Sequence, residues 1–168
     1  MKNIELKVKI NSIRGIAGLL KKLHAKHRGV LKQIDTYYND KEGRLKIREV
    51  NGKYFEKIFY KRPDKESSKI SFYTVSKIKK PQLQKEKSFL KKALGEKVIV
   101  EKQRELWILK NTRVHLDRVK HLGNFLELET EVEKAGKNAE REHKEIIDQL
   151  NLSKYKPFAK SYSDMLMN

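Results

Sequence analysis

FLELETEV, residues 125–132, is the stretch of sequence that decides the fold. Side chains alternate between the two faces of a β-strand, so a strand drawn through this stretch has one apolar and one acidic face. The apolar face carries Leu126, Leu128, Thr130 and Val132, and the acidic face carries Glu127, Glu129 and Glu131. Taken alone, three neighbouring carboxylates indicate the solvated face of an edge strand. In so basic a chain, however, an acidic row calls for another explanation.

The charge of the chain indicates an anionic partner. Among 168 residues, 40 are Lys or Arg and 22 are Asp or Glu, which gives a formal net charge of +18. Nucleic acid is the first candidate for such a charge. The lysines are spread over the whole chain, however, and no helix-turn-helix, zinc-finger or RNA-recognition motif is visible, which argues against nucleic acid. A small phosphorylated ligand also requires positive charge, and charge alone does not decide between the two.

The length and composition of the chain suit one domain, residues 1–168, with a sizeable core. The absence of cysteine excludes disulfide scaffolds and zinc sites made of thiolates. No apolar run approaches the roughly 20 residues of a membrane span. The start, MKNIELKVKI, lacks the apolar core of a signal peptide. We therefore expect a cytoplasmic protein with no membrane association.

Alternating stretches elsewhere in the chain predict further strands. They cover residues 4–10, 30–39, 44–50, 54–61, 69–76, 97–110 and 112–119. Helical spacing of apolar residues predicts helices over residues 11–27, 81–94 and 136–150, with a short one in the tail SYSDMLMN. The helices therefore follow the first, the fifth and the last strand. Short turns join most of the strands, which favours antiparallel pairing, and eight strands can close into a barrel.

Several of these strands also have a charged face. The charged positions are Arg44, Lys46 and Arg48 in RLKIRE, Lys102 and Arg104 in VEKQREL, and Arg113, His115 and Asp117 in TRVHLD. Helices must bury their apolar stripes against the apolar face of the sheet, so the charged faces turn inward and line a tunnel. This predicts an α+β fold: an eight-stranded antiparallel β-barrel with helices packed on its outside.

The facing charges of such a tunnel predict its ligand. Buried charges must be compensated. Phosphate oxygens bind Arg and Lys, while a hard cation such as Mg²⁺ binds carboxylate oxygens, water and phosphate oxygens. A polyphosphate together with its metal ion would therefore compensate the basic and the acidic rows at once.

The order of these segments resembles the CYTH superfamily, the triphosphate tunnel metalloenzymes, which include class IV adenylyl cyclases, thiamine triphosphatases and inorganic tripolyphosphatases. The resemblance covers almost the whole chain. Its motifs are Glu5-Leu6-Lys7-Val8-Lys9, QIDTYYN, GRLKIRE, YKRPD followed by Lys69, KQREL, RVHLD, FLELE and the tail YSDML. Each motif is weak alone, and the set is specific in this order and spacing. The resemblance implies a tunnel that binds a triphosphate through one or more divalent metal ions.

Carried over position by position, the resemblance also implies two sets of ligands. The implied phosphate ligands are Lys9, Arg44, Lys46, Arg48, Arg62, Lys69, Lys102, Arg104 and Arg113. We add Lys7, whose ammonium group we expect to reach the phosphate although its position departs from the family pattern. The implied metal ligands are Glu5, Asp117, Glu127 and Glu129, and the implied metal is Mg²⁺ or Mn²⁺.

Two positions depart from the family pattern. The first motif is usually Glu-x-Glu-x-Lys, but Lys7 stands at its middle position, which removes one carboxylate and adds a cation on the same face. The number of metal ions therefore stays open. In YFEKIFYKRPD, Lys61 and Arg62 cannot both face inward on a regular strand without a bulge. Of these two, we select Arg62 as the inward residue, with Lys61 as the alternative.

Two further residues of the charged faces need an assignment. Tyr37 shares its face with Gln33 and Asp35, and we take it as the catalytic candidate that orients a base or a water. His115 we take as a satisfied polar residue with no metal role.

Three functions are compatible with this pattern. The first is metal-dependent hydrolysis of tripolyphosphate or of an organic triphosphate such as ATP or thiamine triphosphate, with Lys9 or Lys69 assisting the attacking water. The second is cyclisation of ATP to cyclic AMP. The third is non-catalytic binding of polyphosphate or RNA ends, which Lys7 supports and the retained acidic row opposes. A homodimer is among the assemblies that the sequence leaves open.

Overall fold

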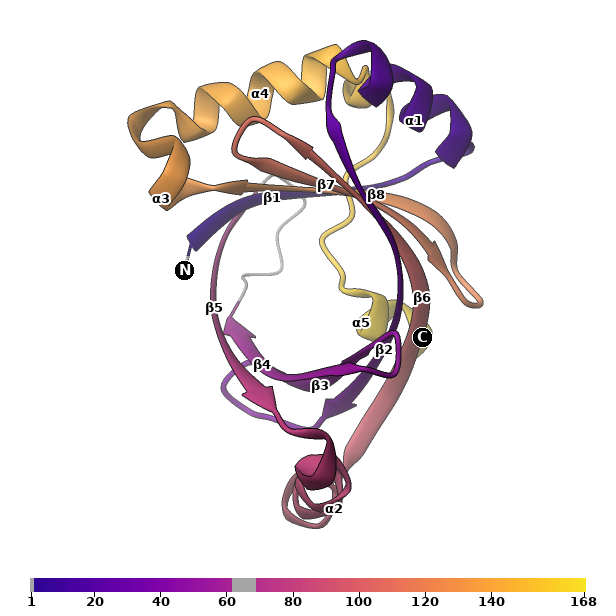
Figure 1. The fold of residues 1–168 in the computed structure, drawn as a ribbon, viewed down its shortest axis with the longest axis vertical. Coiled ribbons are helices and arrows are strands. Elements are labelled where there is room, and N and C mark those ends of the chain that lie inside the picture. Colours follow the sequence, from indigo (N-terminus) through magenta and orange to yellow (C-terminus); the bar gives the residue numbers. More distant parts are fainter. Residues whose placement is uncertain (1, 62–68) are drawn as a thin grey trace.

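A closed antiparallel barrel of eight strands is the centre of the structure (Figure 1). The computed structural model describes residues 2–61 and 69–168, and for residues 69–72 it describes the backbone alone. The strands are β1 (Lys2–Lys9), β2 (Lys26–Tyr38), β3 (Arg44–Val50), β4 (Tyr54–Lys61), β5 (Lys69–Ile78), β6 (Glu96–Leu109), β7 (Thr112–Val119) and β8 (Gly123–Glu131). Around the barrel their order is β1-β5-β4-β3-β2-β6-β7-β8, and β8 pairs back onto β1. The predicted fold class is confirmed.

Helices α1 (Ile13–Lys22), α2 (Leu83–Leu94), α3 (Val132–Ala135) and α4 (Ala139–Gln149) pack on the outside of this barrel, with 3-10 turns η1 (Lys80–Gln82), η2 (Gly136–Asn138) and η3 (Leu152–Lys154). Helix α5 (Tyr162–Leu166) lies within the ring of strands instead (Figure 1), where the Tyr162 hydroxyl donates to Asp117 of β7. Helix α1 begins where the Ser12 hydroxyl accepts a hydrogen bond from the Gly15 N–H at 3.1 Å. In Figure 1, α1 and α4 lie together above β1, β7 and β8, and α2 lies at the opposite end of the view.

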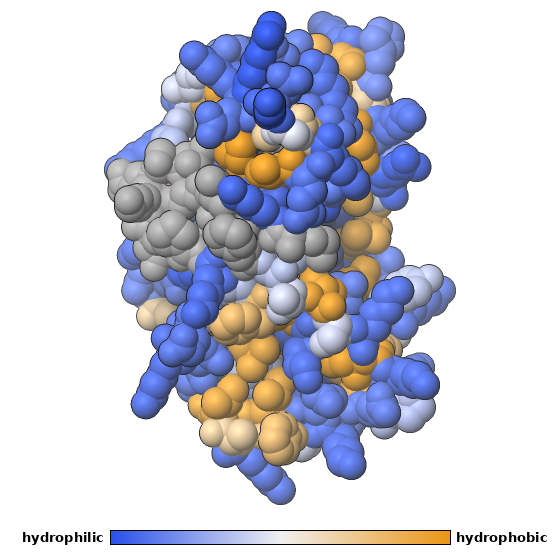
Figure 2. All heavy atoms as spheres, turned by 90° about the vertical axis from the view of Figure 1, so that its left-hand side faces the viewer, coloured by the Kyte–Doolittle hydropathy of each residue, from blue (hydrophilic) through white to orange (hydrophobic). Residues whose placement is uncertain are grey.

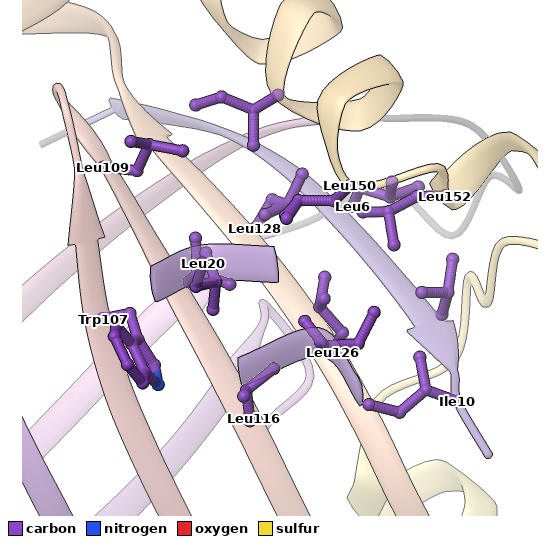
Figure 3. Close-up of a cluster of buried hydrophobic side chains, with 14 of the residues drawn as sticks. Leu6, Ile10, Leu20, Trp107, Leu109, Leu116, Leu126, Leu128, Leu150 and Leu152 are labelled. Atoms are coloured by element: carbon purple, nitrogen blue, oxygen red, sulfur yellow. The ribbon is translucent and has the colours of Figure 1, made fainter. Parts of the chain in front are cut away.

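The main hydrophobic core lies between the strands and the helices α1 and α4 (Figure 3). Leu6, Leu126 and Leu128 reach it from the strands, Leu20 and Ile146 reach it from the helices, and none of the five is more than 7% exposed. Full burial of one such side chain stabilises the fold by about 1.5–3 kcal/mol. The apolar faces are therefore held on the outside of the barrel, and alternation turns the charged faces of the same strands inward.

A smaller hydrophobic core beneath α2 likewise holds the apolar faces of β2, β3 and β4 on the outside of the barrel. Tyr38, Ile47 and Phe55 point outward from β2, β3 and β4, and they meet Leu83 and Leu90 of α2. The residues that alternate with them on these three strands consequently face the interior.

The register of the strands beside β8 brings charged residues together. Glu127 pairs with Lys7 on β1 and with His115 on β7. Glu129 pairs with Arg113 on β7. The acidic row of the opening stretch is thus enclosed between two strands that both carry basic side chains.

Several element boundaries differ from the predicted ones. Helix α1, expected to continue to residue 27, ends at Lys22. Strand β2 begins before residue 30, and a register shift between His27 and Val30, with Gly29 at a φ of 104°, accounts for the difference. A bulge of this kind interrupts the alternation, so the sequence does not show that the strand continues. Strand β8 ends at Glu131, and Val132, expected in the strand, begins α3.

The surface reflects the composition of the chain. Figure 2 shows that the face on the left of Figure 1 is largely hydrophilic, with hydrophobic side chains gathered mainly in its lower half. Among the described residues, no helix combines the length and the apolar character needed to cross a membrane.

Candidate functional site

The barrel encloses a cavity of about 480 Å³, to which all eight strands and helix α5 contribute. This volume suits a small ligand. The ionisable side chains that line it are Glu5, Lys7, Lys46, Arg48, Glu56, Lys102, Arg104, Arg113, His115, Glu127 and Glu129, besides tyrosines. Acidic and basic rows therefore face one interior.

Glu127 lies in the middle of the acidic row and has two cationic partners. Its Oε1 is 3.1 Å from Lys7 Nζ, and its Oε2 accepts a hydrogen bond from Arg104 Nη2 at 2.7 Å. Lys7 Nζ also donates to the carbonyl oxygen of Lys160 at 3.3 Å and lies 4.2 Å from the centre of the Tyr162 ring. Lys7 thus points into the tunnel and joins the acidic row to the C-terminal segment.

Glu129 is paired with Arg113. Its Oε2 accepts hydrogen bonds from Arg113 Nε at 3.1 Å and from Nη2 at 2.9 Å. Arg113 Nη1 also donates to Glu131 at 2.6 Å, and Glu131 in turn pairs with Lys134 of α3. Glu5 lines the same cavity and stands opposite Glu129 in the register.

Asp117 is fully buried and tied to two partners. Arg104 donates to it twice, from Nε at 2.7 Å and from Nη2 at 2.5 Å, and the Tyr162 hydroxyl donates to its Oδ2 at 2.9 Å. Tyr162 belongs to α5, so the C-terminal helix contributes to the tunnel wall. Both oxygens of this predicted metal ligand are therefore engaged by protein donors.

A second buried carboxylate, Asp35, is not among the ligands that the sequence analysis singles out. It accepts hydrogen bonds from Lys46 Nζ at 2.8 Å and from Arg48 Nε and Nη2 at 2.7 Å each, and Lys102 Nζ lies 3.8 Å away. Asp35 thus gathers three of the predicted phosphate ligands. The signal for it in the sequence is its position on the same strand face as Tyr37.

The surrounding cations keep these carboxylates ionised. Burial alone would raise the pKa of Asp35, but Arg48 and neighbouring lysines hold this pKa well below its usual range. Burial likewise opposes ionisation of Glu127, yet Lys7 and Arg104 keep its pKa well below the usual value.

The surroundings of Lys102, in contrast, disfavour its charged form and shift its pKa toward neutral pH. Burial, followed by the repulsion of Arg104, lowers the pKa of Lys102 to about 7, although Asp117 and Asp35 counteract this shift. Its Nζ lies 5.0 Å from the centre of the Tyr162 ring. Near neutral pH, Lys102 therefore exists in both protonation states, and it can take up a proton.

His115 lies between the two glutamates of the acidic row. Its Nδ1 is 3.8 Å from Glu127 Oε2 and 3.8 Å from Glu129 Oε1, which is too far for a hydrogen bond. Within the described part of the chain, no hydrogen bond reaches this buried nitrogen. The three side chains offer ligand atoms that lie within 4.8 Å of one another and could hold a metal ion. The structure therefore brings His115, to which the sequence analysis gives no metal role, to the acidic row.

Tyr37 lines the cavity on the basic side. Its hydroxyl accepts a hydrogen bond from Lys46 Nζ at 3.3 Å. Burial, followed by the negative charge of Asp35, raises the pKa of Tyr37 above its ordinary value, so Tyr37 is a neutral phenol at physiological pH.

Two predicted phosphate ligands lie outside the cavity lining. Arg44 Nη2 donates to Asp164 of α5 at 2.8 Å. Lys9 is exposed at the end of β1, with its Nζ 5.8 Å from the centre of the Phe125 ring.

Two further predicted phosphate ligands have side chains that the structure does not describe. Arg62 lies outside the described residues, as does the side chain of Lys69, whose backbone belongs to β5. The alternative to Arg62, Lys61, is exposed and pairs with Glu42 at 3.0 Å.

The fold is thus a tunnel: a closed barrel whose interior carries facing acidic and basic rows. The chain belongs to the CYTH domain family, whose profile matches residues 1–162. The resemblance noted in the sequence is thereby confirmed.

Individual relatives agree with this membership. The chain is 32% identical over 177 aligned residues, 98% of each chain, to a protein of Methanocaldococcus jannaschii named "Putative adenylate cyclase". Its fold is similar to that of a Pyrococcus horikoshii protein, with a TM-score of 0.83 and 22% identity over 96% of this chain and 98% of the other. A Hippeastrum protein described as a "putative adenylyl cyclase" with a dominant triphosphatase activity gives a TM-score of 0.65 and 17% identity over 98% of this chain and 95% of the other. At these identities the two structures establish the fold alone.

Proposed function

We propose that the protein is a metal-dependent phosphohydrolase that cleaves a triphosphate, either tripolyphosphate or an organic triphosphate, inside its tunnel. One observation carries this proposal: acidic and basic rows line the same cavity, with Glu127 and Glu129 on one wall and Lys46 and Arg48 on the other. Binding of an anion alone requires no acidic row. A triphosphate with a divalent cation requires both.

The acidic row fits such a cation. Carboxylate oxygens are the ligands that Mg²⁺ and Mn²⁺ use in proteins, and the buried His115 Nδ1 adds a polar atom without a hydrogen bond. Glu127 and Glu129 would hold the ion, with Glu5 lining the same cavity and Asp117 behind them. When bound, the ion neutralises charge on the phosphate oxygens.

The basic side chains bind and orient the phosphates. When a triphosphate binds, Lys46 and Arg48 release the Asp35 carboxylate and donate hydrogen bonds to phosphate oxygens instead. Arg104 releases Glu127 in the same way. Charge-assisted hydrogen bonds from a planar guanidinium are well suited to this exchange. Positioning and charge stabilisation of this kind supply most of the catalysis in phosphoryl transfer.

One residue acts on the attacking water: the neutral hydroxyl of Tyr37, held by Lys46, orients it. Lys102 is buried and lines the cavity, and it binds the phosphates as an ammonium group in the complex. Lys9, a candidate from the sequence for assisting the water, is exposed at the end of β1.

Cyclisation of ATP is the second candidate, and the name of the Methanocaldococcus jannaschii relative favours it. The same cradle would hold the triphosphate while the ribose 3′-hydroxyl attacks the α-phosphate. Tyr60 and Tyr73 line the cavity and offer aromatic faces for an adenine ring.

One assay separates these functions. The protein is incubated with Mg²⁺ or Mn²⁺ and with tripolyphosphate, ATP or thiamine triphosphate, and the products are resolved by ion exchange. Orthophosphate indicates the hydrolase, and cyclic AMP with pyrophosphate indicates the cyclase. Ligand binding without either product indicates a non-catalytic binder.

A matched pair of variants tests the role of the acidic row. Glu129→Gln should lower turnover by at least about 100-fold. Glu101→Gln, which alters an exposed glutamate paired with Lys120, should leave turnover unchanged. Equal turnover of both variants at saturating Mg²⁺ or Mn²⁺ would refute metal binding by this row.

A further inference from the structure

His115 has a place in the acidic wall that a structural histidine does not explain. We infer that His115 is a metal ligand, and that its nitrogen tunes the site toward a first-row transition cation such as Mn²⁺ over Mg²⁺. The inference rests on the proposed function, because Glu127 and Glu129 supply the other protein ligands.

The unsatisfied nitrogen is the first observation. His115 is 5% exposed, and its Nδ1 points toward two carboxylates without a hydrogen bond to either. A protonated Nδ1 would be drawn onto one of these carboxylates, at about 2.7–2.9 Å. An unprotonated Nδ1 is an acceptor that faces two further acceptors. A cation between the three atoms would satisfy all of them at once.

The geometry of the glutamates is the second observation. Arg113 binds Oε2 of Glu129, and Oε1 is the oxygen that faces His115. From the described residues, no hydrogen bond reaches this Oε1. The ligand atoms of the group lie within 4.8 Å of one another, so small side-chain rotations bring them around one ion. In the metal-free protein, ion pairs with Arg104 and Lys7 hold the Glu127 carboxylate in place.

The two neighbours of Glu127 on the adjoining strands give His115 its importance. Lys7 on β1 offers an ammonium group, which cannot bind a cation, whereas His115 on β7 offers a nitrogen that can. Mg²⁺ strongly prefers oxygen ligands, whereas imidazole suits first-row transition cations.

Binding of Mn²⁺ alone, without any substrate, tests the inference. Pulsed electron paramagnetic resonance of the wild-type protein should show coupling of bound Mn²⁺ to a ¹⁴N nucleus. His115→Gln should abolish this coupling and weaken Mn²⁺ binding about tenfold, with Mg²⁺ binding changed less than about threefold. The control His27→Gln alters an exposed histidine that pairs with Glu105 and should change none of these quantities.

A second variant keeps the test decisive should His115→Gln fold poorly. His115→Asp replaces the nitrogen by oxygen and should shift the preference toward Mg²⁺. Mn²⁺ bound without nitrogen coupling, or an unchanged metal preference in both variants, would overturn the role of His115. Glu129→Gln separates the two proposals: if it leaves Mg²⁺ and Mn²⁺ binding intact, the acidic row holds no metal and the proposed function fails as well.

Discussion

Arg104 and Asp117 form a bidentate ion pair between β6 and β7, with N–O distances of 2.7 and 2.5 Å, and the same guanidinium reaches Glu127 at 2.7 Å. The tunnel therefore contains its own counter-charges. A phosphate that enters does not meet bare cations but replaces carboxylates as their partners. The exchange therefore requires no further desolvation of the cations, since they are already out of water.

Binding of tripolyphosphate should raise the melting temperature. A ligand at 100 times its Kd that binds only the native state adds about 2.7 kcal/mol to the free energy of unfolding. Chloride at equal ionic strength should have a much smaller effect, because the tunnel charges are already paired. Arg48→Gln should lose the tripolyphosphate effect, whereas Lys120→Gln, on the surface, should keep it. An equal rise with both salts would mean simple screening.

Asp35→Asn should destabilise the protein by about 3–5 kcal/mol, because it leaves Lys46 and Arg48 buried without their carboxylate. Urea denaturation measures this loss. Tripolyphosphate should restore part of it, since phosphate oxygens can replace the missing carboxylate. Asp148→Asn, at an exposed position of α4, is the control and should change stability little. A variant of Asp35 as stable as the wild type would show that Asp35 does not hold the basic row together.

Binding of tripolyphosphate should take up a proton at Lys102. Above pH 7 most of the free protein has Lys102 neutral, because its pKa is about 7. A bound polyanion raises this pKa, so Lys102 is protonated in the complex, and affinity falls as pH rises above 7. Calorimetry at pH 8 in buffers of different ionisation enthalpy measures the uptake. Lys102→Met should abolish it and the exposed Lys120→Met should not; uptake that persists in Lys102→Met belongs to another group.

Lys7→Glu should have two effects of opposite sign. A new carboxylate beside Glu127 adds an oxygen ligand, so Mn²⁺ should bind about tenfold more tightly. Tripolyphosphate in the presence of chelator should bind more weakly, because an attraction becomes a repulsion. Calorimetry measures both on one protein. Since Lys7 points into the tunnel, unchanged affinities would mean that neither ligand comes near Glu127.

The sequence predicts the barrel because its determinants are local. Alternation within β8 separates Leu128 from Glu129, and burial of the leucine against α1 and α4 decides which face turns inward. The same reasoning places Arg48 and Arg104 in the tunnel. For each of these residues, alternation within its own strand is enough to decide whether the side chain points inward or outward.

The partners of the tunnel residues could not be predicted in this way. Asp35 becomes a centre of the basic row only through β3 and β6, and Tyr162 reaches Asp117 across 45 positions of sequence. Neither contact leaves a periodic signal. For His115, residue type alone favours a satisfied polar side chain, and only the distances to both glutamates show an unsatisfied nitrogen.

Helix α5 has a consequence for how the tunnel wall is held together. Tyr162 packs against Phe125 with ring centres 5.1 Å apart, and Asp164 binds Arg44, so α5 joins β8 to β3. Release of this helix would therefore uncouple the two strands and remove the Tyr162 hydroxyl from Asp117 in one step.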